Sequence, residues 1–322
     1  MLTAERKPLY SLSDLGYSCV MASLNTTRGF HVRAPIDLMQ EYTICESFSS
    51  LESPYMVCLK EPRPYGALIG ELLVKKGLLK KGARVMEAGG GYGSLMYGLL
   101  DSYAEYVRRV YMVDLSRSLL GRQRRRLKPW NEIVTAVQAD IHEMVHTVSG
   151  IDLLILNEII GDLDTWTDLD PADLPQDAAR VVEAYDLKIP ASLHFNLNIG
   201  AIHLVEALCM RKIPVFIAEH SSDPIIPDDM DFLAKGLNLD GWPREIRLVG
   251  HSEFTIRFDH LLSVARAFKR HTISGSLLDL VGVKKSPGMR FIFNQRAMAN
   301  EAQEIIFELL DHIREYRWLI IH

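Results

Sequence analysis

The sequence predicts an α/β fold with a Rossmann-like sheet of seven strands and helices on both faces. Short apolar strands alternate with helical segments from residue 84 to residue 156, at intervals that suit right-handed βαβ crossovers and a parallel sheet. A glycine-rich turn follows the first of these strands and leads directly into a helix. The next three strands each end in a polar side chain, which is typical of a sheet that binds a ligand at its carboxyl edge.

Alternating periodicities place the individual elements. The helical apolar pattern of 64–80 leads into the first strand at 84–88, and a helix starts at residue 94. The rest of this core is expected as strand 110–113, helix 117–127, strand 133–137, helix 141–147 and strand 152–156. Beyond it we expect strands at 213–218, 254–258 and 289–293, a helix at 259–270 and a C-terminal helix at 299–315. Residues 1–60 hold turn residues and short apolar pieces, and no element is assigned to them.

The composition is that of an ordinary globular protein. The 322 residues are 48% hydrophobic and 24% charged, with a net charge of −5, which excludes a disordered chain and gives no support to a nucleic-acid partner. No apolar run approaches the roughly 20 residues of a membrane span. Charged residues 5–7 interrupt any secretory signal. Four cysteines without a CxxC pair are expected as reduced thiols, so a cytoplasmic location is predicted.

Changes in composition divide the chain into four segments. Residues 1–63 are interpreted as an N-terminal helical segment and candidate substrate cap, and 64–160 as a Rossmann-like, ligand-binding core. Residues 161–210 are interpreted as an inserted acidic and helical cap on the carboxyl edge of the sheet, and 211–322 as the remainder of the sheet with the C-terminal helix.

The glycine-rich turn indicates which ligand the sheet binds. Gly89, Gly91 and Gly93 let the backbone approach a bound nucleoside closely. A dinucleotide-binding loop needs glycine at its first, third and sixth positions, but the sixth position counted from Gly89 is Ser94, which disfavours an NAD-dependent oxidoreductase. The spacing, with Glu87 two residues before the loop, favours S-adenosylmethionine (SAM) as the cofactor.

The acids at the next two strand ends suit the rest of that cofactor. Asp114 ends the second strand and is expected to accept hydrogen bonds from the ribose hydroxyls, with Leu115 as a further contact. Asp140 ends the third strand and is expected to accept the adenine amino group, while Ile141 covers the ring. Each acid also precedes a helix, so a role as a helix N-cap stays open.

Two polar residues at the end of the fourth strand are the candidate catalytic groups. Asn157 is expected to contact the cofactor and to hold an acceptor atom through its carbonyl oxygen. Glu158 is expected to pair with a cationic acceptor or to take a proton from it. The alternative is that both side chains bond to local backbone.

Three stretches of the chain resemble the MidA-like SAM-dependent methyltransferases, relatives of the mitochondrial complex I assembly arginine methyltransferase. They are the loop 87–96, the run 113–127 with its Asp-Leu-Ser start, and 153–160 with its Asn-Glu pair. The resemblance implies the seven-stranded class I methyltransferase sheet, SAM as cofactor and a protein side chain, arginine in particular, as methyl acceptor. It covers about residues 84 to 160, and Gly161-Asp-Leu-Asp departs from the family's Asp-Ala-Leu-Pro.

Other charged groups give weaker signals. The basic run from Arg122 to Lys128 is interpreted as a solvated helix face. The acidic stretch 162–177 lacks calcium-loop spacing, and the histidines form no close pair, so no metal site is expected. Glu219 and His220 follow a buried strand at the same edge and are interpreted as a structural pair, with proton handling as the alternative.

The sequence therefore predicts a SAM-dependent methyltransferase that acts on a protein side chain. Two alternatives stay open, a methyltransferase for a small molecule and an assembly factor that binds SAM without turnover, because fold does not settle function. No partner other than the methyl acceptor is expected, and neither a membrane nor a metal.

Overall fold

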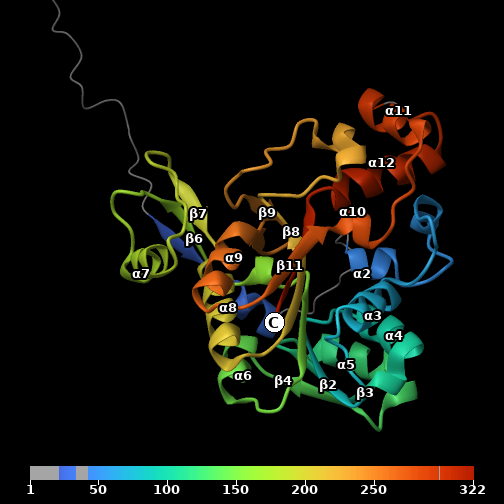
Figure 1. The fold of residues 1–322 in the computed structure, drawn as a ribbon, viewed down its shortest axis with the longest axis horizontal. Helices are drawn as coiled ribbons and strands as arrows, with labels where there is room; N and C mark the ends of the chain where they lie inside the picture. Colours follow the sequence, from blue (N-terminus) through green and yellow to red (C-terminus); the bar gives the residue numbers. More distant parts are fainter. Residues whose placement is uncertain (1–21, 34–42, 297) are drawn as a thin grey trace, which may run out of the picture.

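A central seven-stranded sheet organises the chain (Figure 1). The computed structural model describes residues 22–33, 43–296 and 298–322. From one edge to the other the strands are β11 (Thr272–Ser276), β12 (Tyr316–Ile321), β8 (Val215–His220), β5 (Leu153–Asn157), β2 (Ala83–Ala88), β3 (Val107–Asp114) and β4 (Val134–Gln138). The strands from β8 to β4 are parallel, and β12 is antiparallel to both of its neighbours. A single antiparallel strand beside the fifth parallel one is the arrangement of class I methyltransferases, so the predicted fold class is confirmed.

Two hydrophobic cores cover the two faces of this sheet. All five residues of β5 and all six of β12 are buried, as expected of strands packed on both faces. One core joins the sheet to α3 (Tyr65–Lys75), α4 (Ser94–Tyr103), α10 (Leu277–Leu280) and α12 (Glu301–Ile313). The other joins it to α6 (Ile141–Thr147), α7 (Gln176–Tyr185), α8 (Ile199–Arg211) and α9 (Phe258–Ala267). Helix α5 (Arg117–Arg126) packs on β3 and β4.

The second half of the sheet differs from the prediction at two strands. Residues 254–258 were expected in the sheet, but Phe254 ends β10 (Ser252–Phe254), which pairs with β9 (Glu245–Arg247) in a separate hairpin. Residues 289–293 were expected as a strand and lie in the helix α11 (Pro287–Gln295). Ser286 caps this helix by accepting a hydrogen bond from the Met289 amide, and Pro287 occupies its first turn, so local helix-start signals outweigh the β-like composition. The sixth and seventh strands are β11 and β12 instead.

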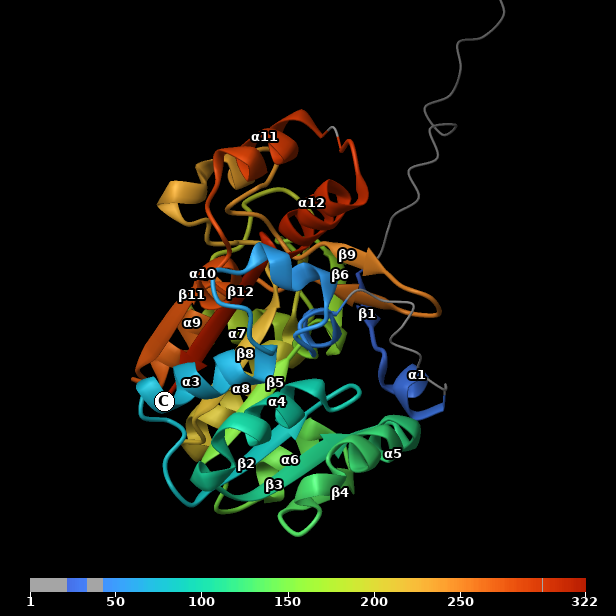
Figure 2. The ribbon, with the colours of Figure 1, turned by 90° about the vertical axis from the view of Figure 1, so that its right-hand side faces the viewer.

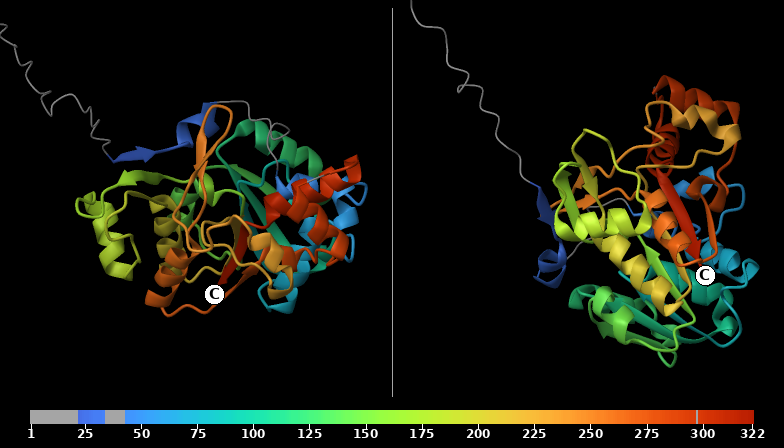
Figure 3. Two further views of the ribbon diagram at one scale, coloured as in Figure 1. Left: turned by 90° about the horizontal axis from the view of Figure 1, so that it is seen from above. Right: turned by 60° about the vertical axis from the view of Figure 1, so that its left-hand side comes forward.

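The N-terminal part of the chain pairs with the segment inserted after β5. Strand β1 (Ser23–Asn25) is antiparallel to β6 (Thr165–Leu169), which pairs in turn with β7 (Phe195–Leu197). Helix α1 (Arg28–Arg33) follows β1, and Figure 2 places it between the β9 hairpin and α5. In Figure 3 the N-terminal strand lies on the same side of the molecule as the inserted segment. The four segment boundaries expected from composition stay a prediction.

Short elements connect these layers. They are α2 (Ile44–Ser47) and the 3-10 helices η3 (Pro54–Cys58), η4 (Ala104–Tyr106), η5 (Lys128–Trp130), η6 (Ile160–Asp162) and η7 (Asp228–Ala234). Within the described ranges, none of the helices combines the length and the apolar character that a membrane crossing needs.

Candidate functional site

The glycine-rich loop between β2 and α4 has a backbone conformation that glycine adopts without strain and other residues rarely adopt. Gly89, Gly91 and Gly93 all have positive φ values, of 64°, 50° and 84°, which favour glycine over other residues. A Cβ at Gly89 would lie 2.4 Å from the side chain of Ile159, which would have to shift to make room for it.

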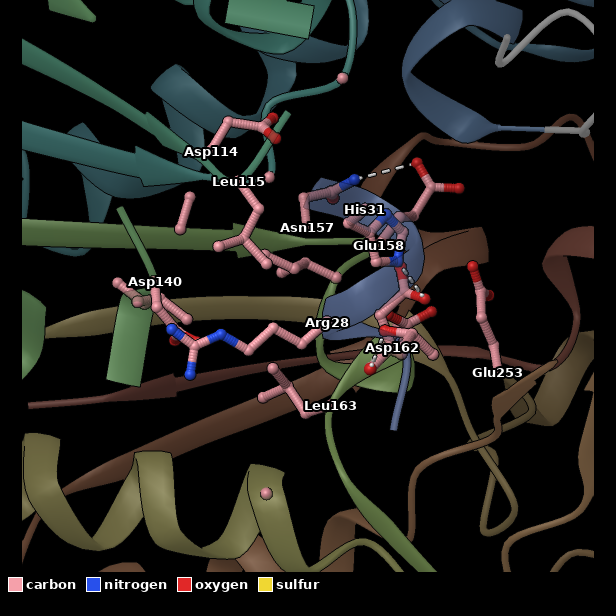
Figure 4. Close-up of a pocket in the computed structure, with 18 of the residues that line it drawn as sticks. Arg28, His31, Asp114, Leu115, Asp140, Asn157, Glu158, Asp162, Leu163 and Glu253 are labelled. Carbon is pink, nitrogen blue, oxygen red and sulfur yellow. Dashed lines mark hydrogen bonds and ion pairs between the residues drawn. The ribbon is translucent and has the colours of Figure 1, made fainter. Parts of the chain in front are cut away.

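A cavity of about 690 Å³ opens at the carboxyl ends of the parallel strands, beside this loop. Its lining contains nine of the ten residues predicted for cofactor binding or catalysis, namely Glu87, Gly89, Gly91, Asp114, Leu115, Asp140, Ile141, Asn157 and Glu158. The tenth, Gly93, is not among the lining residues and lies at the start of α4, against Gln123. Figure 4 shows Asp114, Leu115, Asp140 and Asn157 around this cavity. The structure thus brings the ends of four strands into one pocket.

Glu87 carries an unsatisfied polar atom in the pocket. Its side chain is 2% exposed, and its Oε2 atom has no hydrogen-bond partner. Burial raises the pKa of this carboxyl group to about 8, and the neighbouring Asp114 adds to the shift. A buried carboxyl oxygen without a donor is costly to a folded chain, which favours a positively charged ligand at this point.

The acids at the ends of β3 and β4 already have local hydrogen bonds. Asp114 accepts from the amide of Ser116 (2.8 Å) and from the side chain of Gln123 (3.1 Å), and burial raises its pKa to about 6. Asp140 caps α6 through the amide of His142 (2.8 Å), and its second oxygen lies 3.2 Å from Nε of Arg28. The capping role that the sequence left open is therefore present at Asp140, together with exposure to the pocket.

The end of β5 carries a tight polar network. Asn157 accepts a hydrogen bond from the hydroxyl of Tyr65 (2.8 Å) and donates to Glu158 (3.0 Å). Glu158 has a positive φ of 52°, and its carboxylate also accepts from the amides of Ile44 (2.8 Å) and Cys45 (3.3 Å). Glu158 therefore joins the start of α2 to the sheet, and burial raises its pKa.

Beside Glu158 lies a cluster of Tyr316, His220 and His312, of which only His220 was identified from the sequence. The hydroxyl of Tyr316 donates to Glu158 (2.8 Å), and the His220 ring lies 4.0 Å from the Tyr316 ring and 4.7 Å from that of His312. Burial lowers the pKa of His312 to about 4 and that of His220 well below its usual value. Burial also raises the pKa of Glu219 well above its usual range. The buried imidazoles are thus neutral at pH 7.

A second group at the pocket was missed entirely. His31 Nε2 lies 2.9 Å from Oδ1 of Asp162, and His251 Nε2 lies 3.4 Å from the same oxygen. The expectation of no metal site was based on sequence spacing. These three residues are between 89 and 220 positions apart, so no local pattern marks them.

Two other features of the sequence are the basic run from Arg122 to Lys128 and the four cysteines. Arg126 of the basic run pairs with Glu46 (3.3 Å), and Arg122 stacks over Tyr92. Cys45, Cys58 and Cys209 are free thiols, while Cys19 lies outside the described residues.

Comparisons with known proteins support the architecture. A COG1565 superfamily protein of unassigned function from Burkholderia thailandensis aligns with a TM-score of 0.51 and 15% identity, over 87% of this chain and 81% of that one. The chain shares its fold. This agrees with the fold expected from the MidA-like resemblance.

Two further solved structures show weaker likeness. A second COG1565 superfamily member from Burkholderia thailandensis, bound to S-adenosyl-homocysteine, has a TM-score of 0.48 and 16% identity over 87% of this chain and 78% of that one. Magnesium protoporphyrin IX methyltransferase from Synechocystis PCC 6803, with bound SAM, has a TM-score of 0.39 and 12% identity over 79% and 76%. No family model and no curated protein matches the chain.

Proposed function

We propose that the chain is a SAM-dependent methyltransferase whose acceptor is a cationic nitrogen, with a protein arginine side chain as the leading acceptor. The observation that carries the proposal is the unpartnered Oε2 of Glu87, buried beside the glycine loop at the carboxyl edge of a class I methyltransferase fold. A carboxyl group at this position suits the α-ammonium group of SAM. A cytoplasmic location stays part of this proposal.

The other pocket residues fit the remaining parts of the cofactor. Asp114 would accept the ribose hydroxyls, since its oxygens have lone pairs beyond the two local bonds. Leu115 and Ile141 would cover the adenine ring, and Asp140 would accept its amino group. When bound, SAM supplies an activated methyl group on a sulfonium centre.

The charge of the pocket favours a cationic acceptor. Eleven acidic side chains line it, against Arg28 and two histidines, His31 and His251, whose pKa values neighbouring carboxylates raise in spite of burial. The acids are Glu46, Glu87, Asp114, Asp140, Glu143, Glu158, Asp162, Asp164, Asp177, Glu219 and Glu253. Burying a cation beside carboxylates lowers their pKa values and restores their ionisation.

Glu158 and Glu219 are the groups best placed to handle the acceptor. A guanidinium has a pKa above 12 and needs carboxylates that orient it and compensate its charge. On methylation the acceptor nitrogen would lose a proton, which a carboxylate at the end of β5 or β8 would have to accept. Glu158 or Glu219, ionised by the ion pair, takes this proton, and Tyr316 holds Glu158 in place.

Two measurements test the proposal in sequence. Isothermal titration of the full chain with S-adenosyl-homocysteine should show one site, and NADH should give no heat of binding. Mass spectrometry after incubation with SAM should then show a 14-dalton increase on an arginine-containing acceptor. Transfer only to small amines would favour the small-molecule alternative. Binding without transfer to any acceptor would favour an assembly factor, and no binding would refute the proposal.

A further inference from the structure

His31, Asp162 and His251 converge at the edge of the pocket from three separate elements. His31 belongs to α1, Asp162 ends η6 just beyond β5, and His251 lies in the turn between β9 and β10. One nitrogen or oxygen of each residue lies within 4.8 Å of those of the other two. Figure 4 shows His31 and Asp162 facing one another beside Glu158.

Packing and hydrogen bonds hold these three elements together. The hydroxyl of Thr27 donates to the backbone carbonyl of Asp162 (2.7 Å), which fixes the start of α1 on η6. The ring of Phe30 stacks on that of His251, with centroids 4.3 Å apart and an angle of 21°. Gly250 has a φ of 91°, and a Cβ there would lie 2.7 Å from Phe30, so glycine lets the hairpin approach α1. The imidazoles are therefore positioned before any ligand arrives.

The bonding of His251 is incomplete. Its side chain is 5% exposed, and neither ring nitrogen makes a hydrogen bond. Nevertheless Nε2 lies 3.4 Å from the Asp162 carboxylate and 3.6 Å from that of Glu253. Burial lowers the pKa of His251, but the two carboxylates outweigh it and raise this pKa to about 10, so a metal ion would have to displace a proton to bind the imidazole.

We propose that His31, Asp162 and His251 bind a divalent transition-metal ion of the zinc type. Two imidazoles and one carboxylate form a ligand set used for zinc and for non-haem iron, with the remaining coordination positions open. Zinc bonds of about 2.0–2.1 Å in tetrahedral geometry place ligand atoms about 3.3 Å apart. Each imidazole lies 2.9 Å or 3.4 Å from the same Asp162 oxygen, and no two ligand atoms of the cluster are more than 4.8 Å apart, so small shifts would give this separation.

The open positions of the ion would face the cavity, because all three residues line it. Asp162 follows the candidate catalytic pair Asn157 and Glu158 by only a few residues, so the ion would lie beside the acceptor. There a water molecule or another lone-pair donor would complete its coordination, whereas a protonated guanidinium, which has no lone pair, would not bind the ion. The site does not depend on the proposed methyl transfer.

The test measures metal content and metal-dependent stability of the full chain after removal of any histidine tag. The chain is stripped with a chelator, dialysed against Zn²⁺ and analysed by mass spectrometry of metals, with Mg²⁺ as the hard-cation comparison. The ligand variants are His31→Gln, His251→Gln and Asp162→Asn. The matched control is His194→Gln, because His194 forms a half-exposed pair with Asp168 (3.0 Å) outside the cluster.

The wild type and the His194 control should bind one Zn²⁺ per chain and melt at a higher temperature with Zn²⁺ than without it. Each ligand variant should lose more than about 100-fold in affinity, since changing a group that only supports a ligand costs roughly 10–100-fold. Substoichiometric binding by the wild type, or full binding by His251→Gln, would overturn the proposal and leave an ion-paired cluster. Circular dichroism verifies folding, and titration with S-adenosyl-homocysteine on the same samples separates this result from the proposed function.

Discussion

Replacing Glu87 by glutamine should make the ligand-free protein more stable and its cofactor binding weaker. The pKa of Glu87 rises from 4.5 to about 8 in the fold, so the folded state keeps a proton that the unfolded chain loses. The contribution of Glu87 to the free energy of unfolding is therefore fully present below pH 4.5, and it is lost as the pH rises through 8. At about 1.4 kcal/mol per pKa unit, the loss amounts to about 3 kcal/mol at pH 7.

Glutamine keeps the shape of the side chain and cannot ionise. Glu87→Gln should therefore raise the free energy of unfolding by about 3 kcal/mol at pH 7, and by less than about 1 kcal/mol at pH 5. Urea denaturation at both pH values measures the difference. Glu105→Gln, at an exposed position, is the matched control and should change neither value.

The same variant should bind the cofactor more weakly. Loss of a charge-assisted hydrogen bond costs about 1.5–3 kcal/mol, so the Kd for SAM should rise roughly 10-fold to 100-fold. At pH 7 about nine-tenths of Glu87 is protonated, so the wild type should release close to one proton on binding, and the variant none. Titration in buffers of different ionisation enthalpy detects this proton. A stability gain independent of pH, or unchanged affinity, would refute the reasoning.

Three further predictions concern the same pocket. Asp114→Ala should lower the affinity for SAM about tenfold or more, as measured by titration calorimetry. A lower melting temperature with unchanged affinity would show that Asp114 only stabilises the start of the following helix. Gly91→Val should abolish SAM binding while the circular dichroism is largely kept, because φ is 50° there, and undiminished affinity would contradict the placement of the cofactor. Glu158→Gln should keep SAM affinity within a few fold and lose most transfer to arginine. Tyr316→Phe, which removes only a donor to Glu158, should lose less, and full turnover of Glu158→Gln would show a structural carboxylate.

The half of the sheet that carries the glycine-rich loop was predictable because the sequence patterns that mark its elements follow one another directly along the chain. In β2 and the loop that follows it, a buried strand, positive-φ glycines and a helix start lie within a dozen residues. The other half lacks such signals. The edge strand β11 contains Ser274 and Gly275 and is half-buried, so its apolar pattern is weak. The apolar run of β12 directly follows the helix α12, and periodicity alone does not separate a buried strand from a helix.

The acceptor side of the site depends on contacts between distant segments. Tyr316 lies 158 residues beyond Glu158, and His31 lies 131 residues before Asp162. Only the topology, with β12 inserted beside β8 and β1 paired to β6, brings these side chains together. A single sequence carries no pattern for such pairs, because neither a period nor a spacing links them.

The position of residues 22–33 has a consequence for the rate of ligand exchange. This segment lines the pocket through Leu24, Thr27 and Arg28, yet α1 buries none of its residues. It is held by the three-residue pairing of β1, by the contacts of Thr27, Phe30 and His31 with Asp162 and His251, and by ion pairs from Arg28, whose side chain is 58% exposed. Segments with so little buried surface open locally at a small fraction of the global unfolding free energy. Dissociation of a bound nucleoside would therefore follow the opening of this segment, and a tightly held product would protect residues 22–33 from proteolysis and amide exchange for the whole of its residence time.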